Sequence, residues 1–191
     1  MSTLHVKLTG IAPLLMHADT LANPLHPLKK RMAEITKKKK KTDEDIEAIA
    51  QIEWRASLYY DPDTGIHMPA VNLERMICDA AKLQKRGQDV KRGITVIDDM
   101  PAIRYEGPRE PDALYRHQGG AFVDTRSVRN QQSKVMRTRA IFRSWALEFD
   151  ASVDNEVLND DELKSFITVA GRLVGLGDFR PRFGKFTAGF S

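Results

Sequence analysis

The feature that most constrains the fold is a change of hydrophobic period along the chain. Residues 3–9 alternate strictly, with Leu4, Val6 and Leu8 on one side and polar side chains on the other, which is typical of a half-buried strand. Residues 72–85 instead repeat their apolar side chains at helical spacing, after Asn72 as a potential cap. Both periods within one chain of 191 residues predict an α+β fold.

The same two periods return in the second half of the chain. Residues 140–150 alternate with mostly apolar side chains and predict a central strand. Asn159 and the acidic residues after it open a helix whose apolar stripe reaches Val174, and a last strand is expected before residue 190. Residues 94–97 and 102–105 predict a small separate sheet.

A first insertion is expected at about residues 20–60. Prolines interrupt its beginning, so a long surface loop is predicted there. The lysine run of residues 37–41 follows, and Thr42 then caps a helix that reaches Leu58. The lysines have two interpretations of equal weight, a solvated loop and a phosphate-binding segment. The residues of this run assigned to nucleic-acid binding are Lys37, Lys38 and Lys39.

A second insertion, of strands and loops, is expected at about residues 86–135. From residue 122 to residue 143 the chain carries six cationic side chains against one acid, Asp124. This window is the predicted basic surface, which suits a polyanionic partner. Its cations are Arg126, Arg129, Lys134, Arg137, Arg139 and Arg143, of which the first five are assigned to binding.

Composition excludes several classes of protein. No stretch approaches the length of apolar sequence that a membrane helix or a secretory signal needs, so a cytoplasmic protein without membrane contact is expected. The net charge is only +4, so the position of the charges is more informative than their sum. The five histidines lack metal-ligand spacing and the single Cys78 lies at a core position of a predicted helix, so neither a metal nor a cofactor is expected.

The segment from Gly175 to Phe186 resembles the glycine-rich loop of the RAMP superfamily, the CRISPR-associated RNA-binding proteins. Gly175-Leu176-Gly177 matches the first half of the family pattern, and the residues that follow include two arginines. The second half departs from the pattern because it offers one glycine, Gly184, in place of two. Residues 65–75 are similar to the strand, proline and capped helix of effector-backbone subunits in that superfamily.

The resemblance implies a single domain, residues 1–191, with an RRM-like or ferredoxin-like antiparallel sheet that has helices on one face. It also implies a backbone-type subunit that binds single-stranded RNA or DNA and assembles along the strand as a homo-oligomer or filament. Partner proteins of an effector complex are a further implication. Function as an enzyme is not the primary expectation.

The loop also has an interpretation from its residues alone. Three glycines let a backbone approach a ligand and expose successive N–H groups, and nearby cations suit phosphates. Phe179, Phe183 and Phe186 can stack on bases, although a tight turn followed by core phenylalanines explains the same pattern. The residues of this loop assigned to binding are Gly175, Gly177, Arg180, Arg182, Gly184 and Lys185.

Two alternatives to a binding module stay open. RAMP endoribonucleases activate a 2′-hydroxyl with a His or Tyr near a Lys, and some backbone subunits use an Asp after the first strand. His17 and Asp19 lie at that position and are weak catalytic candidates. The favoured interpretation is a loop histidine that bonds backbone or phosphate and an aspartate that bonds the N–H groups of a turn. The other alternative is an interaction factor or inhibitor that mimics a RAMP subunit.

Overall fold

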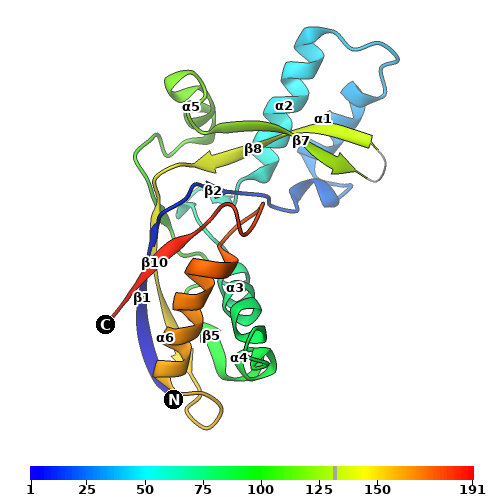
Figure 1. Cartoon of the computed structure of the whole chain (residues 1–191). Helices are drawn as coiled ribbons and strands as arrows, with labels where there is room; N and C mark the ends of the chain where they lie inside the picture. The colour runs from blue at the N-terminus through cyan, green and yellow to red at the C-terminus, as the bar shows by residue number, and fades with distance from the viewer. Residues whose placement is uncertain (131–132) are drawn as a thin grey trace. The chain divides into compact units, whose positions relative to one another are not determined.

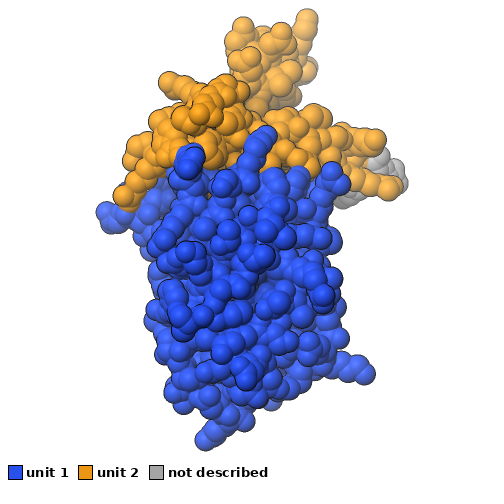
Figure 2. All heavy atoms as spheres, turned by 60° about the vertical axis from the view of Figure 1, so that its left-hand side comes forward, with its two compact units in different colours: residues 1–15, 60–106, 142–191 blue, residues 16–59, 107–141 orange. Residues whose placement is uncertain are grey.

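The computed structural model of the chain describes residues 1–130 and 133–191, which divide into two compact units (Figure 2). Unit 1 consists of residues 1–15, 60–106 and 142–191. Unit 2 consists of residues 16–59 and 107–141. Unit 2 therefore contains most of the first predicted insertion and the later part of the second.

Unit 1 is built on an antiparallel sheet with the strand order β10-β1-β9-β5, and β6 also pairs with β9 (Figure 1). The predicted strand at residues 3–9 is confirmed, and its buried side is the one that carries Leu4, Val6 and Leu8. The strands are β1 (Ser2–Gly10), β5 (Ile94–Val96), β6 (Ile103–Arg104), β9 (Ala146–Val153) and β10 (Phe186–Phe190). The antiparallel α+β fold is thus confirmed.

Three helices cover one face of this sheet (Figure 1). They are α3 (Ala70–Lys82), α4 (Gly87–Gly93) and α6 (Asp160–Val169), and a π-helical turn, Ala170–Val174, extends the last of them. Asn159 caps α6 as predicted, because its side chain accepts the N–H of Glu162 at 2.9 Å while Glu162 accepts the N–H of Asn159 at 3.0 Å. The apolar stripes of α3 and α6 bury Leu73, Met76, Ile77, Leu163, Phe166 and Ile167.

Three expectations for unit 1 were wrong. Asn72 does not cap α3, because the helix begins earlier, after Pro69, and Asn72 lies within its first turn. The short strands β5 and β6 belong to the main sheet, where β9 supplies their partners, and do not form a sheet of their own. The strand predicted at residues 140–150 is broken at Arg143 and Ser144, which are exposed and turn the chain between β8 (Ser133–Phe142) and β9.

Two short strands, β3 (Tyr60–Asp61) and β4 (Gly65–Ile66), form a hairpin in unit 1. In its turn, Asp61 accepts the N–H groups of Asp63 and Thr64, each at 2.9 Å. The remaining strand of the unit is β2 (Leu14–Leu15), whose two residues are fully buried.

Unit 2 combines a helical hairpin with a long β-hairpin. Thr42 caps α2 (Asp43–Ser57) as predicted, with a reciprocal pair of bonds between Thr42 and Asp45. The helix α1 (Pro27–Thr36), which packs against α2, falls where a loop was expected; Pro27 stands in its first turn and the His26 side chain accepts the N–H of Leu28. The other elements are η1 (Thr20–Ala22), α5 (Pro111–Arg116), η2 (His117–Gly119) and β7 (Val123–Asn130).

The interior of unit 2 is centred on Trp54, which is 1% exposed. Its indole N–H donates to the carbonyl of Phe122 at 2.8 Å, and its ring meets the ring of Tyr115 edge-on with centroids 5.1 Å apart. Burial of a Trp side chain with its N–H satisfied is strongly stabilising. Trp54 therefore joins α2 both to α5 and to the chain that leads into β7.

Candidate nucleic-acid interface

The residues assigned to binding divide between the two units. Those of the lysine run and of β7 and β8 lie in unit 2, together with His17 and Asp19. Those of the glycine-rich loop lie in unit 1.

The basic hairpin, β7 and β8, places cations directly opposite one another. The two strands run side by side (Figure 1), and in their antiparallel register Arg126 lies opposite Arg137 and Arg129 lies opposite Lys134. Side chains three positions apart on a strand point to opposite faces, so the two cation pairs lie on opposite faces of the hairpin. Like charges directly opposite each other destabilise a strand pair, so each pair needs a compensating anion.

Carboxylates bind both members of the pair Arg126 and Arg137. The guanidinium of Arg126 donates from two of its nitrogens to Asp124, two positions away on the same strand, and this hydrogen bonding holds the pKa of Arg126 above its usual value. Arg137 binds the carboxylate of Glu53 from α2. Within the described part of the chain, no carboxylate pairs with Lys134, which is exposed.

The helix α2 also satisfies the backbone of β8. The second carboxylate oxygen of Glu53 accepts the N–H of Thr138 at 2.9 Å. One helical turn later, the hydroxyl of Ser57 accepts the N–H of Ala140 at 2.9 Å and donates to the carbonyl of Trp54 at 2.7 Å. One helical turn rises about 5.4 Å, which is close to the distance between alternate residues of a strand. Glu53 and Ser57 are therefore spaced to reach the N–H groups of Thr138 and Ala140. All three polar side chains here, Glu53, Ser57 and Thr138, are buried.

The lysine run is only partly available to a ligand. Lys38 donates to the carboxylate of Asp45 at 2.6 Å, and this bond, followed by the N–H of Thr42, lowers the pKa of Asp45. Lys37 and Lys39 are exposed. Their proposed contact with phosphate stays a prediction.

A cavity of about 570 Å³ in unit 2 brings several predicted residues together. Arg137 and Arg139 from β8 line it, as do His17 and Asp19 from the segment that leads into η1. Lys29 of α1, which was not assigned to binding, is a further cation in its lining. The sequence gives no direct sign of this cavity, because its walls come from segments more than 100 residues apart.

The glycine-rich loop folds back on its own unit. The N–H of Leu176 donates to the carbonyl of Gly184, the N–H of Gly184 donates to that of Pro13, and the N–H of Asp178 donates to that of Leu15, each at 2.8 Å. A Cβ on Gly184 would lie 1.7 Å from the Leu176 carbonyl oxygen. Packing of the loop thus requires a glycine at position 184. The sequence predicted that N–H groups of this loop are exposed to a ligand, but these three donate to protein carbonyls instead.

The cationic side chains of the loop differ in their availability to a ligand. Arg180 approaches Asp79 of α3, which also binds Lys82 at 2.7 Å and Arg75 at 3.2 Å. Burial opposes ionisation of Asp79, but its hydrogen bond with Lys82 and the charges of all three cations outweigh burial and lower its pKa. Arg182 is exposed and Lys185 half-exposed, and neither pairs with a carboxylate within the described residues.

The three phenylalanines of the loop separate into exposed and core positions. Phe179 is 43% exposed, whereas Phe186 is 3% exposed and packs edge-on against Trp145. Phe183 is intermediate and lies 5.8 Å from Phe179, measured between ring centroids. Phe179 is therefore the most exposed of the three rings and the first that a base can reach.

On the face of the sheet opposite the helices, the described outward positions of β1 and β9 carry no Phe, Tyr or Trp side chain. The outward positions of β1 alternate with its buried leucines and valine, and those of β9 lie beside them in register. Lys7 forms an ion pair with Glu148 at 3.4 Å, and the imidazole of His5 is hydrogen-bonded to the carboxylate of Asp150 at 2.7 Å. Recognition of bases by aromatic rings on this face, the usual mode of an RRM, is not supported by β1 and β9.

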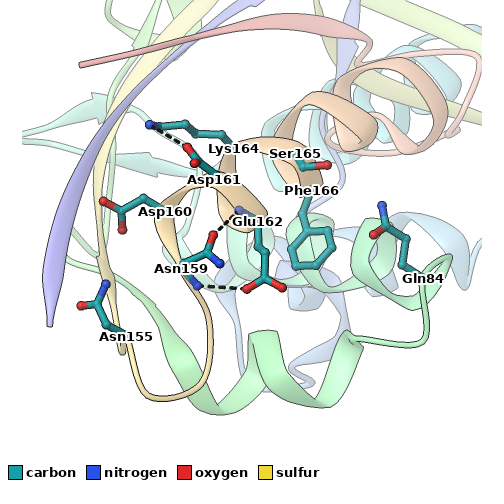
Figure 3. A pocket seen from close by; sticks show the side chains of 9 residues that line it. All are labelled: Gln84, Asn155, Asn159, Asp160, Asp161, Glu162, Lys164, Ser165 and Phe166. Atoms are coloured by element: carbon teal, nitrogen blue, oxygen red, sulfur yellow. Dashed lines mark hydrogen bonds and ion pairs between the residues drawn. The ribbon is translucent and has the colours of Figure 1, made fainter.

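A second hollow, of about 710 Å³, lies in unit 1 at the start of α6 (Figure 3). The residues that line it include Asp160, Asp161 and Glu162. The capping hydrogen bonds between Asn159 and Glu162 join two residues of the same lining. Its carboxylates repel phosphate, so this hollow does not suit a polyanion.

Residues 1–130 and 133–191 contain no group of three or more His, Cys, Asp or Glu side chains placed to hold a metal ion. None of the helices described is both long enough and apolar enough to cross a membrane. Comparison with models of known protein families finds no match, and comparison with curated protein sequences finds none either.

Proposed function

We propose that the chain binds single-stranded nucleic acid, with the basic hairpin of unit 2 as the principal contact. The observation that carries the proposal is the cross-strand placement of cations, Arg126 opposite Arg137 and Arg129 opposite Lys134. The two strands carry five cationic side chains against the single acid Asp124. Such an excess on an extended element favours a ligand with closely spaced negative charges.

The compensation by carboxylates narrows the proposal. Asp124 and Glu53 neutralise the pair Arg126 and Arg137, which therefore serve as structural cations as well as potential phosphate ligands. Lys134 lies on the opposite face, is exposed and has no carboxylate partner within the described residues. Because phosphate contacts supply most of the affinity of non-specific binding, Lys134 is a cation of the hairpin that is available to a phosphate.

The loop of unit 1 supports the proposal in a different way. The exposed ring of Phe179 stands next to Arg180 and close to Arg182 in sequence. Aromatic rings stack on the bases of single strands and add about 1–3 kcal/mol per base, while cations contact the phosphates. A single strand presents both groups, whereas in a duplex the bases are already stacked.

The proposal is tested by titrating fluorescent oligo-U and oligo-dT with the full chain at several salt concentrations. The logarithm of the affinity should fall with the logarithm of salt, by about 0.7 for each phosphate contacted. Lys134→Ala should weaken binding and reduce that slope by about one contact. Lys91→Ala, which removes an exposed lysine of α4 in unit 1, is the matched control and should leave binding unchanged.

Absence of binding to either oligonucleotide would remove the proposal, and so would an affinity that does not respond to salt. Assembly along the strand, as the RAMP resemblance implies, is part of the same proposal. It predicts that the mass of the complex in light scattering increases in steps as the oligonucleotide is lengthened.

One observation favours a second function, metal-independent cleavage of RNA. His17 lines the same cavity as Lys29, Arg137 and Arg139, which combines a possible general base with cations able to stabilise a phosphorane. This function predicts cleavage of RNA in EDTA that leaves a 2′,3′-cyclic phosphate and is lost in His17→Ala. Intact RNA after prolonged incubation would exclude it.

A further inference from the structure

We propose that the unit 2 cavity is a pocket for one nucleotide, either free or as a unit of the bound strand. This inference rests on the proposed function and deepens it, because it assigns a chemical unit of the ligand to a place in the molecule. The cavity lies between η1, α1, α2 and β8. Its volume of about 570 Å³ falls within the range of about 300–1,000 Å³ that small-ligand pockets occupy.

The first wall of the cavity is cationic. Arg137 and Arg139 lie two positions apart on β8, so both side chains point to the same face of the strand, and Lys29 lines the cavity from α1. Arg139 is 9% exposed, and charges act more strongly on an anion where water is excluded. A guanidinium also offers its donors in a planar fork that matches two phosphate oxygens. Lys29, Arg137 and Arg139 outnumber the two carboxylates of the lining, Asp19 and Glu53, so this wall suits the phosphate of a nucleotide.

The second wall is aliphatic. Leu21 and Ala22 of η1, Met32 and Ala33 of α1, and Ala56 of α2 contribute to it. A free phosphate or a carboxylate is not stabilised by contact with an aliphatic surface, whereas a base is stabilised when its faces are buried against it. Met adapts its shape to a flat ligand because its side chain is unbranched and polarisable. The two walls together fit a ligand with one anionic end and one flat, weakly polar end.

The polar groups between the walls can recognise the sugar or the edge of the base. The lining includes the side chains of His17, Asp19 and Thr36, which together offer donors and acceptors.

The cationic wall is positioned before any ligand binds. Glu53, which is 8% exposed, holds Arg137 with one oxygen and the N–H of Thr138 with the other. Ser57 fixes the N–H of Ala140 on the other side of Arg139. The backbone of β8 on both sides of Arg139 is therefore tied to α2. Fixing the groups in advance reduces the entropy lost on binding.

The test uses the full chain and ligand-observed NMR, with 5′-UMP and 5′-AMP as probes, uridine as the probe without phosphate, and inorganic phosphate as the probe without base. The mononucleotides should bind saturably and more tightly than uridine, by roughly 10-fold for a charge-assisted contact. Inorganic phosphate should bind more weakly than either. Equal affinity for inorganic phosphate and the mononucleotides would overturn the assignment of the aliphatic wall to a base.

Variants locate the site. Ala33→Trp places a large ring in the cavity and should abolish mononucleotide binding, whereas Ala113→Trp, at an exposed position of α5, should not change it. Lys29→Met should weaken mononucleotide binding by roughly 10-fold; Lys29 is only half-buried, so this variant tests the cationic wall without a large change in the core. Unchanged mononucleotide binding in Ala33→Trp would overturn the pocket.

Oligonucleotide titration, run in parallel, separates failure of the pocket from failure of the proposed function. An oligonucleotide that binds and is displaced by 5′-UMP supports the pocket as a site for one unit of the strand. An oligonucleotide that binds equally to the parent and to Ala33→Trp, without competition by mononucleotides, overturns the pocket and leaves the proposed function in place. Mononucleotide binding without oligonucleotide binding supports a pocket for free nucleotides and removes the proposed function, and binding of neither removes both.

Discussion

The carboxylate of Glu53 accepts the backbone N–H of Thr138 at 2.9 Å, across 85 positions of the chain. The same side chain binds Arg137 through its other oxygen. A single buried acid of α2 thus both completes the hydrogen bonding of β8 and compensates the charge of a neighbouring arginine. The basic hairpin depends on an acidic partner that lies outside the basic window of the sequence.

Replacement of Glu53 by Ala should destabilise unit 2. The N–H of Thr138 and the guanidinium of Arg137 would both lose their partner, and an unsatisfied buried polar group costs about 1–3 kcal/mol. Urea unfolding followed by the fluorescence of Trp54, in a Trp145→Phe background, measures the loss in the unit concerned. Glu47→Ala, an exposed acid on the same helix, should change the unfolding free energy by less than about 0.5 kcal/mol. Equal effects of the two substitutions would contradict the role assigned to Glu53.

Gly184→Ala should be much more damaging than Gly119→Ala. Both glycines have positive φ angles, of 70° and 64°, so both alanines meet a backbone cost of about 1–2 kcal/mol. At Gly184 the added Cβ also collides with the Leu176 carbonyl oxygen, whereas at Gly119 it meets no atom within 4 Å. Thermal unfolding of the two variants compares them directly, and similar losses would show that packing of the loop is not the decisive constraint.

Asp79 should make the loop of unit 1 sensitive to acid. Its pKa is lowered in the folded chain, so its contribution to stability is fully present above its ordinary pKa of about 3.9 and is lost as the pH falls through the lower folded value. Asp79→Asn removes this dependence and, by weakening the contact with Arg180, should speed hydrogen exchange at Leu176 and Asp178 at neutral pH. Asp161→Asn, whose side chain is 95% exposed, serves as the control. Exchange rates that do not differ between the two variants would refute the prediction.

The cap of α2 offers a local test of the helix that lines the cavity. Thr42 accepts the N–H of Asp45, and Asp45 accepts that of Thr42. Thr42→Ala should lower the unfolding free energy by about 1 kcal/mol, measured by urea unfolding, while Thr42→Ser should retain most of the stability because its hydroxyl can make the same bond. A loss of equal size in both variants would assign the effect to the methyl group rather than to the cap.

The sequence was most informative where one local pattern determines the structure. The alternation of Leu4, Val6 and Leu8 predicted β1, and the polar residues at Thr42 and Asn159 predicted the starts of α2 and α6. Caps and periodicity act within a few residues. They can therefore be recognised without knowledge of the rest of the chain.

The sequence was least informative where contacts between distant segments determine the structure. The helix α1 buries none of its residues fully, so its apolar pattern is weak, and the lysines after it suggested a loop. The break between β8 and β9 was hidden because Arg143 and Ser144 fit the alternation of a continuous strand. The partners of Arg137 and Arg180, Glu53 and Asp79, lie 84 and 101 positions away, beyond the range of any local pattern.

The two-segment construction of unit 2 has a consequence for the order of folding. Pairing of β1 with β9 joins Thr9 to Ala146, and the N–H of Met68 joins the carbonyl of Pro101. The first contact brings the start of segment 16–59 toward the end of segment 107–141, and the second brings the end of segment 16–59 toward the start of segment 107–141. The loops that remain to close are therefore short, and the entropy lost on closing them is small. Damage to the sheet of unit 1 should therefore spread to the cavity and the basic hairpin, whereas damage confined to the hairpin should leave the sheet intact.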